Sequence, residues 1–257
     1  MILKKGTTFT IDNQCEVGWE FLQTLEYTGD LLAQMGLVPA KNPVLNICLV
    51  PHTGLAEGGY RLSVRSAVPE VVIAGSGPEG IRCGLFAFLE YLGVRWFTPQ
   101  EDPILPGAVE LTDLEVAAEP SFPYRGLHIC AGAHHFDRTV GEWMSHLKMN
   151  RKLTHHGEVG LIGEELASLG LRPDTCAHSY SYWIPDHHHE AHPDWFALVG
   201  GKRIRQKEGG QLCLANAEMR EEFTAHILRY HAEHPEVSIV GICANDGYGW
   251  CECDECL

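Results

Sequence analysis

The chain has 257 residues, 45% of them hydrophobic and 21% charged, which is enough to bury a large core and excludes disordered, collagen-like and small disulfide-stapled proteins. Thirty-four acidic against nineteen basic side chains give a formal charge of −15, which argues against a nucleic-acid partner or an anionic membrane surface. No segment has the about 20 consecutive apolar residues of a membrane span, and residues 1–10 lack the apolar run of a signal peptide. We therefore expect a cytoplasmic protein.

The first part of the chain combines short strands with two helices. One helix is predicted over residues 17–35. Apolar side chains from Ile81 to Leu92 recur at helical spacing and predict a second helix that ends at Gly93. Runs rich in branched residues predict strands over residues 44–50, 60–64, 71–74 and 94–97. This pattern indicates a small α/β domain.

Residues 98–120 carry four prolines and several acidic side chains without a long amphipathic period. Such a composition is typical of a connection that runs over a surface. We therefore place a domain boundary here, with an accessory α/β domain over residues 1–119 and a second domain over residues 120–257.

The second domain alternates predicted strands with predicted helices. The strands cover residues 124–129, 152–155, 174–178 and 238–242, and the helices cover residues 139–149, 160–169 and 217–234. Four such units with parallel connections are half of an eightfold barrel, which typically needs about 250 residues. The predicted fold class is α/β, with the first half of a TIM-type barrel. We expect the chain to be an amino-terminal fragment that ends in the loop after the fourth strand.

Gly75, Gly77 and Gly80 form a G-x-G-x-x-G pattern between a predicted strand and a predicted helix. This pattern is a hallmark of dinucleotide-binding folds, in which the next strand ends in an acidic residue that binds the ribose. That strand here ends at Thr98, and Pro78 removes one backbone donor from the turn. We therefore interpret the glycines as a tight structural turn and expect no organic cofactor, while NAD-dependent oxidoreduction stays a less favoured alternative.

Three segments carry a resemblance to known families. Residues 77–99 resemble the accessory domain of α-glucuronidases and β-N-acetylhexosaminidases, and Pro123–Gly126 resembles the first barrel strand of the hexosaminidases. A later stretch resembles a bacterial family of α-glucuronidase-like glycoside hydrolases labelled as a domain of unknown function. Its matching residues are His192, Pro193, Trp195, Phe196, Ala197, Leu198, Gly201, Lys202, Arg203, Gln211, Leu212, Cys213, Asn216, Asn245, Asp246 and Gly247. The resemblance implies hydrolysis of O-glycosyl bonds in an oligo- or polysaccharide of the uronic-acid or amino-sugar type.

In such a barrel the active site is built by loops at the carboxyl ends of the strands. Imidazoles, a guanidinium and an amide gathered there suit a polyhydroxylated sugar. Each histidine can equally be a structural residue. The predicted substrate-binding residues, all close to predicted strand ends, are Arg125, His128, His155, His178, Tyr180 and Asn245.

Glycoside hydrolysis normally needs two carboxyl groups. By the resemblance, Asp246 stands where related enzymes place an acid at the end of the fourth strand, and we predict it to be catalytic. The pattern departs from the hexosaminidase Asp-Glu pair because these two positions read Asn245-Asp246, which puts the substrate-assisted mechanism in doubt. Asn-Asp-Gly is also a strong turn sequence. We expect the second carboxyl group beyond Leu257.

Ten cysteines are many for a chain of this length. Cys251, Cys253 and Cys256 lie within six residues, and Cys213 is the best candidate for a fourth ligand of a structural zinc ion. A cluster of reduced thiols is the alternative. A second group could also bind a metal, although consecutive residues point in different directions: His187, His188, His189, Glu190 and His192.

Apart from the less favoured oxidoreductase, these patterns are compatible with two classes of function. The favoured hypothesis is that the chain is part of a glycoside hydrolase. By itself, this fragment is expected to be inactive. The alternative is a noncatalytic carbohydrate-binding or scaffold protein. The sequence does not set the oligomeric state.

Overall fold

The computed structural model describes residues 1–15, 18–128 and 137–257 of the chain. The chain divides into two compact units. The first contains Met1–Leu127, Ala131–Lys152 and Gly163–Arg172, and the second contains His128–Cys130, Leu153–Ile162 and Pro173–Leu257. These units are defined by internal contacts, and the domain boundary at residue 120 stays a prediction.

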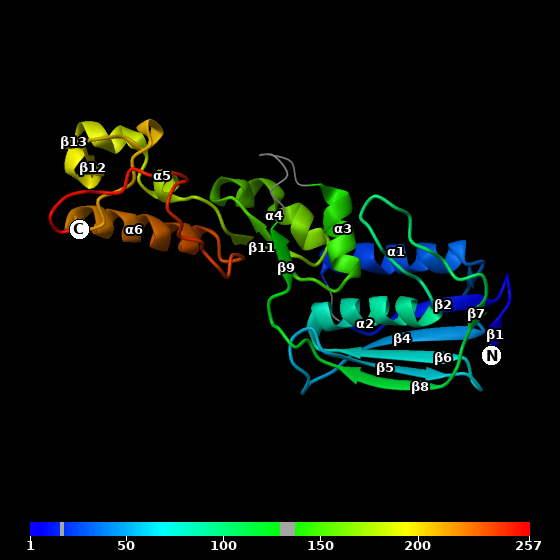
Figure 1. The fold of residues 1–257 in the computed structure, drawn as a ribbon. Helices are drawn as coiled ribbons and strands as arrows, with labels where there is room; N and C mark the ends of the chain where they lie inside the picture. The colour runs from blue at the N-terminus through cyan, green and yellow to red at the C-terminus, as the bar shows by residue number, and fades with distance from the viewer. Residues whose placement is uncertain (16–17, 129–136) are drawn as a thin grey trace. The chain divides into compact units, whose positions relative to one another are not determined.

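A six-stranded mixed sheet forms the centre of the first unit, in the order β3-β2-β4-β6-β5-β8 (Figure 1). Its strands β3, β2, β4 and β6 run parallel, whereas β5 is antiparallel to both of its neighbours. The short strands β1 (Ile2–Leu3) and β7 (Val109–Glu110) pair separately. The strands of the main sheet are β2 (Thr8–Asn13), β3 (Val38–Pro39), β4 (Leu45–Pro51), β5 (Tyr60–Arg65), β6 (Glu70–Gly75) and β8 (Leu114–Ala118).

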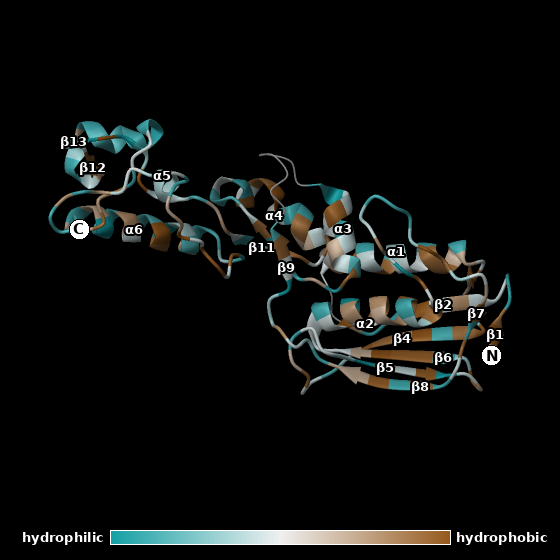
Figure 2. Ribbon diagram, viewed as in Figure 1, coloured by the Kyte–Doolittle hydropathy of each residue, from teal (hydrophilic) through white to brown (hydrophobic). Residues whose placement is uncertain are grey.

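Two helices, α1 (Trp19–Gln34) and α2 (Gly77–Leu92), cover one face of this sheet (Figure 1). Alternate residues of the central strands point toward them, as the register pairs of β4 and β6 show: Ile47 lies opposite Val71 and Leu49 opposite Ile73, all fully buried. Figure 2 shows these strands as the most hydrophobic part of the unit. The sheet therefore buries its apolar side chains under both helices.

The glycines of the G-x-G-x-x-G pattern have a packing role in this unit. A Cβ on Gly75 would collide with the backbone of Ile81, and a Cβ on Gly80 would collide with the carbonyl oxygen of Gly59. Gly93 ends α2 in the left-handed region, at φ +105°. The pattern thus permits a close strand-to-helix turn, in agreement with the structural interpretation.

The segment predicted to be a connection is partly regular. Residues 98–120 contain β7 and the edge strand β8, whose residue Leu114 pairs with Val64 of β5. The strand expected over residues 94–97 is absent, and only Arg95 forms a β-bridge, to Ile104. The prolines obscured β8 because they lie before it and at its end, where an edge strand tolerates them.

The next part of the chain repeats strand and helix. The strands are β9 (Gly126–His128), β10 (Arg151–Thr154) and β11 (Arg172–Thr175), adjacent in that order. The helices α3 (Arg138–His146) and α4 (Val159–Ser168) connect them, and η1 (His156–Glu158) leads into α4. The N–H groups of Arg172 and Cys176 donate to the carbonyl oxygens of Asn150 and Thr154, and this rising order makes β10 and β11 parallel. Residue 129, the expected end of the first strand, lies outside the described residues.

The second unit continues with short elements and one long helix. The short elements are α5 (Tyr180–Trp183), η2 (Asp186–Glu190), η3 (Pro193–Trp195), β12 (Leu198–Val199), β13 (Lys202–Arg203) and η4 (Gln206–Glu208). Helix α6 (Ala217–Glu233) is capped by the Asn216 side chain, which accepts from the N–H of Met219. The fourth strand expected over residues 238–242 is not assigned, but Thr175 donates to Ile239 and His178 forms a parallel bridge with Cys243. The segment therefore follows the edge of β11 without a continuous ladder.

Candidate functional site

His178 and Asp246 form a contact pair just beyond β11. The ring nitrogen Nδ1 of His178 lies 2.7 Å from the carbonyl oxygen of Ala244, and Nε2 lies 3.1 Å from Oδ1 of Asp246. A carbonyl oxygen only accepts hydrogen bonds, so Nδ1 carries a proton. The contact between Nε2 and a carboxylate oxygen then requires a second proton on one of the two groups. The Asp246 side chain is 89% exposed and therefore open to a ligand.

Asn245 is held by three neighbouring side-chain and backbone groups. Its backbone N–H donates to Oε1 of Gln211 (3.1 Å), and its carbonyl oxygen accepts from Nε2 of the same residue (2.8 Å). Its own Nδ2 donates to Oε1 of Gln206 at 2.6 Å, and its Oδ1 accepts from the N–H of Ser181 at 3.3 Å. An amide has two N–H donors and two acceptor lone pairs, so Asn245 can still bond a sugar hydroxyl.

The other predicted site residues lie in different surroundings. Arg125 belongs to the first unit, where its Nη2 donates to Oε1 of Glu79 at 2.6 Å. His128 ends β9, and His155 is exposed before η1. Tyr180 begins α5, and its ring contacts Phe223 edge-on at 5.7 Å. The structure thus gathers His178, Tyr180, Asn245 and Asp246 in the second unit, linked through α5.

Two exposed aromatic residues follow Asp246 that sequence reasoning did not single out. Tyr248 is 89% exposed and Trp250 is 53% exposed, on the loop between Asp246 and the cysteines. Aromatic side chains of this size are normally buried for most of their area. Gln206 and Gln211, which hold Asn245, are buried, and of the two only Gln211 is among the residues that carry the family resemblance. In the sequence, their position two and four residues after Asp246 could have identified Tyr248 and Trp250 as candidate site residues.

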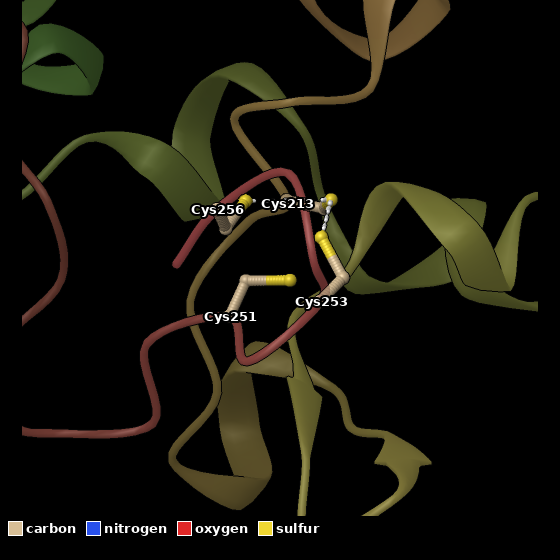
Figure 3. Close-up of side chains that lie close together, drawn as sticks. All are labelled: Cys213, Cys251, Cys253 and Cys256. Atoms are coloured by element: carbon tan, nitrogen blue, oxygen red, sulfur yellow. Dashed lines mark hydrogen bonds between the residues drawn. The ribbon is translucent and has the colours of Figure 1, made fainter.

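Four cysteine sulfurs converge at the end of the chain (Figure 3). The Sγ atom of Cys213 lies 3.7 Å from that of Cys253 and 3.9 Å from that of Cys256, and all four, including Cys251, lie within 4.8 Å of one another. Four sulfurs at about 2.3 Å around a tetrahedral zinc ion are separated by about 3.8 Å. The cluster can therefore hold a metal ion, with the four residues that the sequence predicts.

Donors around Cys251 favour its thiolate form. The Leu198 N–H lies 3.4 Å from its Sγ, and Nη1 of Arg203 lies 3.7 Å from the same atom. Burial raises the pKa of Cys251, but the hydrogen bonds from Leu198 and Cys253 outweigh it and lower the pKa to about 7. A deprotonated thiol is the form that binds metals.

Two histidines of η2 and His192 stack their rings on one another or on Trp195. The rings of His187 and His188 stack at 4.3 Å, and His192 stacks on Trp195 at 4.1 Å. Among the described residues, metal-ligand atoms converge at the four cysteines and not at these histidines. No helix in the described part of the chain is long and apolar enough to cross a membrane.

Comparisons with known proteins show a family and a shared fold. Residues 102–257 match the family described as Domain of unknown function (DUF4838). No curated protein sequence matches the chain. Among solved structures, a Flavobacterium johnsoniae chitobiase aligns with TM-score 0.56 and 13% identity, over 93% of this chain and 41% of that one. A Streptomyces plicatus N-acetyl-β-hexosaminidase aligns with TM-score 0.56 and 16% identity, over 91% and 54%.

A third similar structure is a GH138 enzyme targeting pectin rhamnogalacturonan II, with TM-score 0.55 and 10% identity, over 90% of this chain and 38% of that one. The chain spans about half or less of the length of these hydrolases. At such identities the likeness shows a shared mixed α/β fold.

Proposed function

Because this chain belongs to the DUF4838 family and shares its fold with glycoside hydrolases, we propose that it serves in a carbohydrate-active enzyme that hydrolyses glycosidic bonds. The substrate would be a glycan of the uronic-acid or amino-sugar type. The observation that carries the proposal is the contact of His178 with Asp246 on an exposed loop beyond the parallel strand β11. We further propose that β9, β10, β11 and the segment at Cys243 are the first four strands of a barrel.

The pair supplies the acid that glycoside hydrolysis requires. Because His178 Nδ1 is committed to a carbonyl oxygen, the proton held between Nε2 and the Asp246 carboxylate is the mobile one. Asp246 gives this proton to the glycosidic oxygen as the bond to the sugar breaks, so the leaving group departs as an alcohol, water supplies the hydroxyl of the released sugar and Asp246 remains as the carboxylate. His178 is then a positioning residue and Asp246 the catalytic acid.

Substrate contacts are proposed for the polar and aromatic residues around this pair. Tyr248 and Trp250 offer exposed rings on which the apolar face of a sugar can stack. Asn245 offers its remaining donor to a hydroxyl group. The predicted roles of Arg125, His128, His155 and Tyr180 in substrate binding stay predictions.

We propose that the metal held by Cys213, Cys251, Cys253 and Cys256 is zinc. Tetrahedral sites with four sulfur ligands typically hold zinc or iron, and structural zinc sites frequently use four cysteines. A site with four thiolates leaves no open position for a water molecule. Its role is therefore structural, and it takes no part in the hydrolysis.

The test is hydrolysis, by the purified enzyme in which this chain is proposed to serve, of aryl glycosides and oligosaccharides of glucuronic acid and N-acetylglucosamine. The proposal expects product release that falls about a hundredfold or more in Asp246→Asn, as for a missing general acid. The exposed Asp102→Asn is the matched control and should retain activity. Saccharide binding without any cleavage would favour the noncatalytic carbohydrate-binding alternative. Neither binding nor cleavage across the panel would overturn the proposal.

A further inference from the structure

The segment that follows η4 contacts the loop of residues 245–256 at both of its ends. Gln211 bonds the backbone of Asn245 with both atoms of its side-chain amide, and two residues later Cys213 contacts Cys253 and Cys256. Residues i and i+2 of an extended segment project to the same side. One short piece of chain therefore joins the proposed sugar-binding end of the loop to the cysteine end.

Backbone bonds also hold the loop to the segment that follows η4 and to β12. The N–H of Gln211 donates to the Gly249 carbonyl oxygen at 2.9 Å, and the N–H of Glu252 donates to Leu198 at 2.8 Å. A Cβ on Gly249 would collide with the carbonyl oxygen of Gly209, so the two segments touch without an intervening side chain. The position of the loop is thus set by its contacts with residues 198–213.

Asp246 itself contributes little to holding the loop. Its side chain is 89% exposed and, within the described part of the chain, its one ion pair is with the half-exposed His178. Its neighbour Asn245 is fixed by the buried Gln206 and Gln211. Asp246 therefore keeps its place only as long as the loop stays against residues 206–213.

The cysteine end of the loop lacks regular structure that could hold it alone. Residues 251–257 form one turn, closed by the N–H groups of Cys256 and Leu257, which both donate to Cys253. The sulfurs are 3.7 to 3.9 Å apart where Cys213 meets Cys253 and Cys256, which is too far for a disulfide and fits the edge of a zinc tetrahedron. Arg203 and the Leu198 N–H stand beside Cys251, where they offset the negative charge of a tetrathiolate site.

We propose that a zinc ion bound by the four cysteines clamps residues 245–256 against residues 198–213, and that its occupancy controls the position of Asp246. Zinc joins Cys213 to Cys251, Cys253 and Cys256 at the end of the loop. Gln211 then holds Asn245 so that Asp246 stays in contact with His178. Loss of the metal frees the cysteine end and loosens the hydrogen bonds to Gln211. The consequence for saccharide affinity rests on the proposed function, whereas the clamp itself does not.

The experiment measures metal content and amide hydrogen exchange of the full chain. We expect about one zinc ion per chain as purified, and we expect a chelator to speed exchange at residues 245–252 by at least about tenfold, a change that zinc reverses. Cys253→Ser should give the same fast exchange, while Cys253→His, which retains a zinc ligand, should remain protected. Cys48→Ser, in the sheet of the first unit, is the matched control.

The possible outcomes test the zinc clamp and the proposed function separately. Bound iron, absence of bound metal, or exchange at residues 245–252 that is unchanged after zinc is removed would overturn the clamp. Should Cys253→Ser fail to fold, chelation of the wild-type chain supplies the same comparison. Exchange that responds to zinc in a chain that binds none of the saccharides would uphold the clamp and reject the proposed function. Saccharide affinity equal with and without zinc would reject the control of Asp246.

Discussion

Gln211 and Asn245 bond to each other twice, because the Asn245 backbone N–H donates to Oε1 of Gln211 while Nε2 of Gln211 donates to the Asn245 carbonyl oxygen. The Gln211 side chain is completely buried, and its pairing resembles one step of a β-ladder made by a side chain. A glutamine is suited to this because its amide presents a donor and an acceptor side by side, as the backbone does. The residue before the proposed acid is thereby fixed without any strand in the segment itself.

Replacement of Gln211 tests this contact. Gln211→Ala leaves the N–H and the carbonyl oxygen of Asn245 without these partners in a partly buried place, and we expect a loss of about 2 kcal/mol in the free energy of unfolding. Urea unfolding followed by fluorescence measures it. Zinc content should stay unchanged because the cysteines are retained. The exposed Gln100→Ala is the control, and a loss in Gln211→Ala no larger than in this control would refute the role of the pair.

Arg82 is the most buried charged side chain of helix α2. Its Nη1 donates to the carbonyl oxygen and hydroxyl of Ser145, and Nη2 donates to Met149. These bonds connect α2 to the last turn of α3 and to the residues that follow it. We expect Arg82→Leu to lower the free energy of unfolding by about 3 kcal/mol. In thermal unfolding, the exposed Arg61→Leu should change the midpoint little, and equal midpoints for both variants would contradict this account.

His146 should make the stability of the first unit depend on pH. Burial, together with the nearby charge of Arg82, lowers the pKa of His146 from its ordinary 6.5 to about 3. Between pH 6.5 and about 3, His146 binds a proton in the unfolded chain but not in the folded chain. The free energy of unfolding is therefore highest above pH 6.5 and decreases as the pH falls toward 3. The slope should approach roughly 1 kcal/mol per pH unit.

The measurement is the difference in unfolding free energy between wild type and His146→Phe across this range. The aromatic replacement retains packing against Tyr27 and Trp96, whose rings lie 4.4 and 5.1 Å from that of His146. The variant should therefore lose the slope while folding. The exposed His231→Phe should preserve it, and parallel pH profiles for wild type and His146→Phe would show that the ring does not stay neutral.

Local patterns predicted the long helices and the central strands correctly. The apolar period from Ile81 to Leu92 marks α2, and the branched runs mark β4, β5 and β6, because their side chains are the core itself. Strand β2 was missed because Thr8–Asn13 is largely polar and owes its place to pairing with β4. Strand β8 was missed because edge strands tolerate neighbouring prolines. Both owe their conformation to partners distant in the sequence.

The sequence predicted which residues form the cysteine cluster, but not the hydrogen bonds that position Asn245. The spacing of Cys251, Cys253 and Cys256 suggested a metal cluster, and the structure brings Cys213 to it. Spacing could not show that Asn245 is held by Gln206 and Gln211, because those bonds join residues more than thirty positions apart. The pairing of His178 with Asp246 likewise depends on the parallel bridge at Cys243.

Gly249 offers a test of the contact between the two segments of the clamp. Its backbone has φ +73°, which residues with a side chain rarely adopt, and a Cβ would collide with the Gly209 carbonyl oxygen. We expect Gly249→Ala to break the bond from Gln211 to Gly249 and to cost about 2 kcal/mol of unfolding free energy. Hydrogen exchange at Gln211 reports this bond. Gly107→Ala, which has open space around it, should behave as wild type, and unchanged protection of Gln211 in Gly249→Ala would remove the close approach from the account.

The most direct test of the proposed function is saccharide titration of the chain followed by the indole N–H signal of Trp250 in two-dimensional NMR spectra. Trp250→Phe identifies that signal among the six tryptophans. Addition of a uronic-acid or N-acetylhexosamine oligosaccharide should shift it, and Asp246→Asn should weaken the affinity by about tenfold, the loss expected for one hydrogen bond to a charged group. A Trp250 signal that stays in place at millimolar concentrations of every saccharide in the panel would contradict the account.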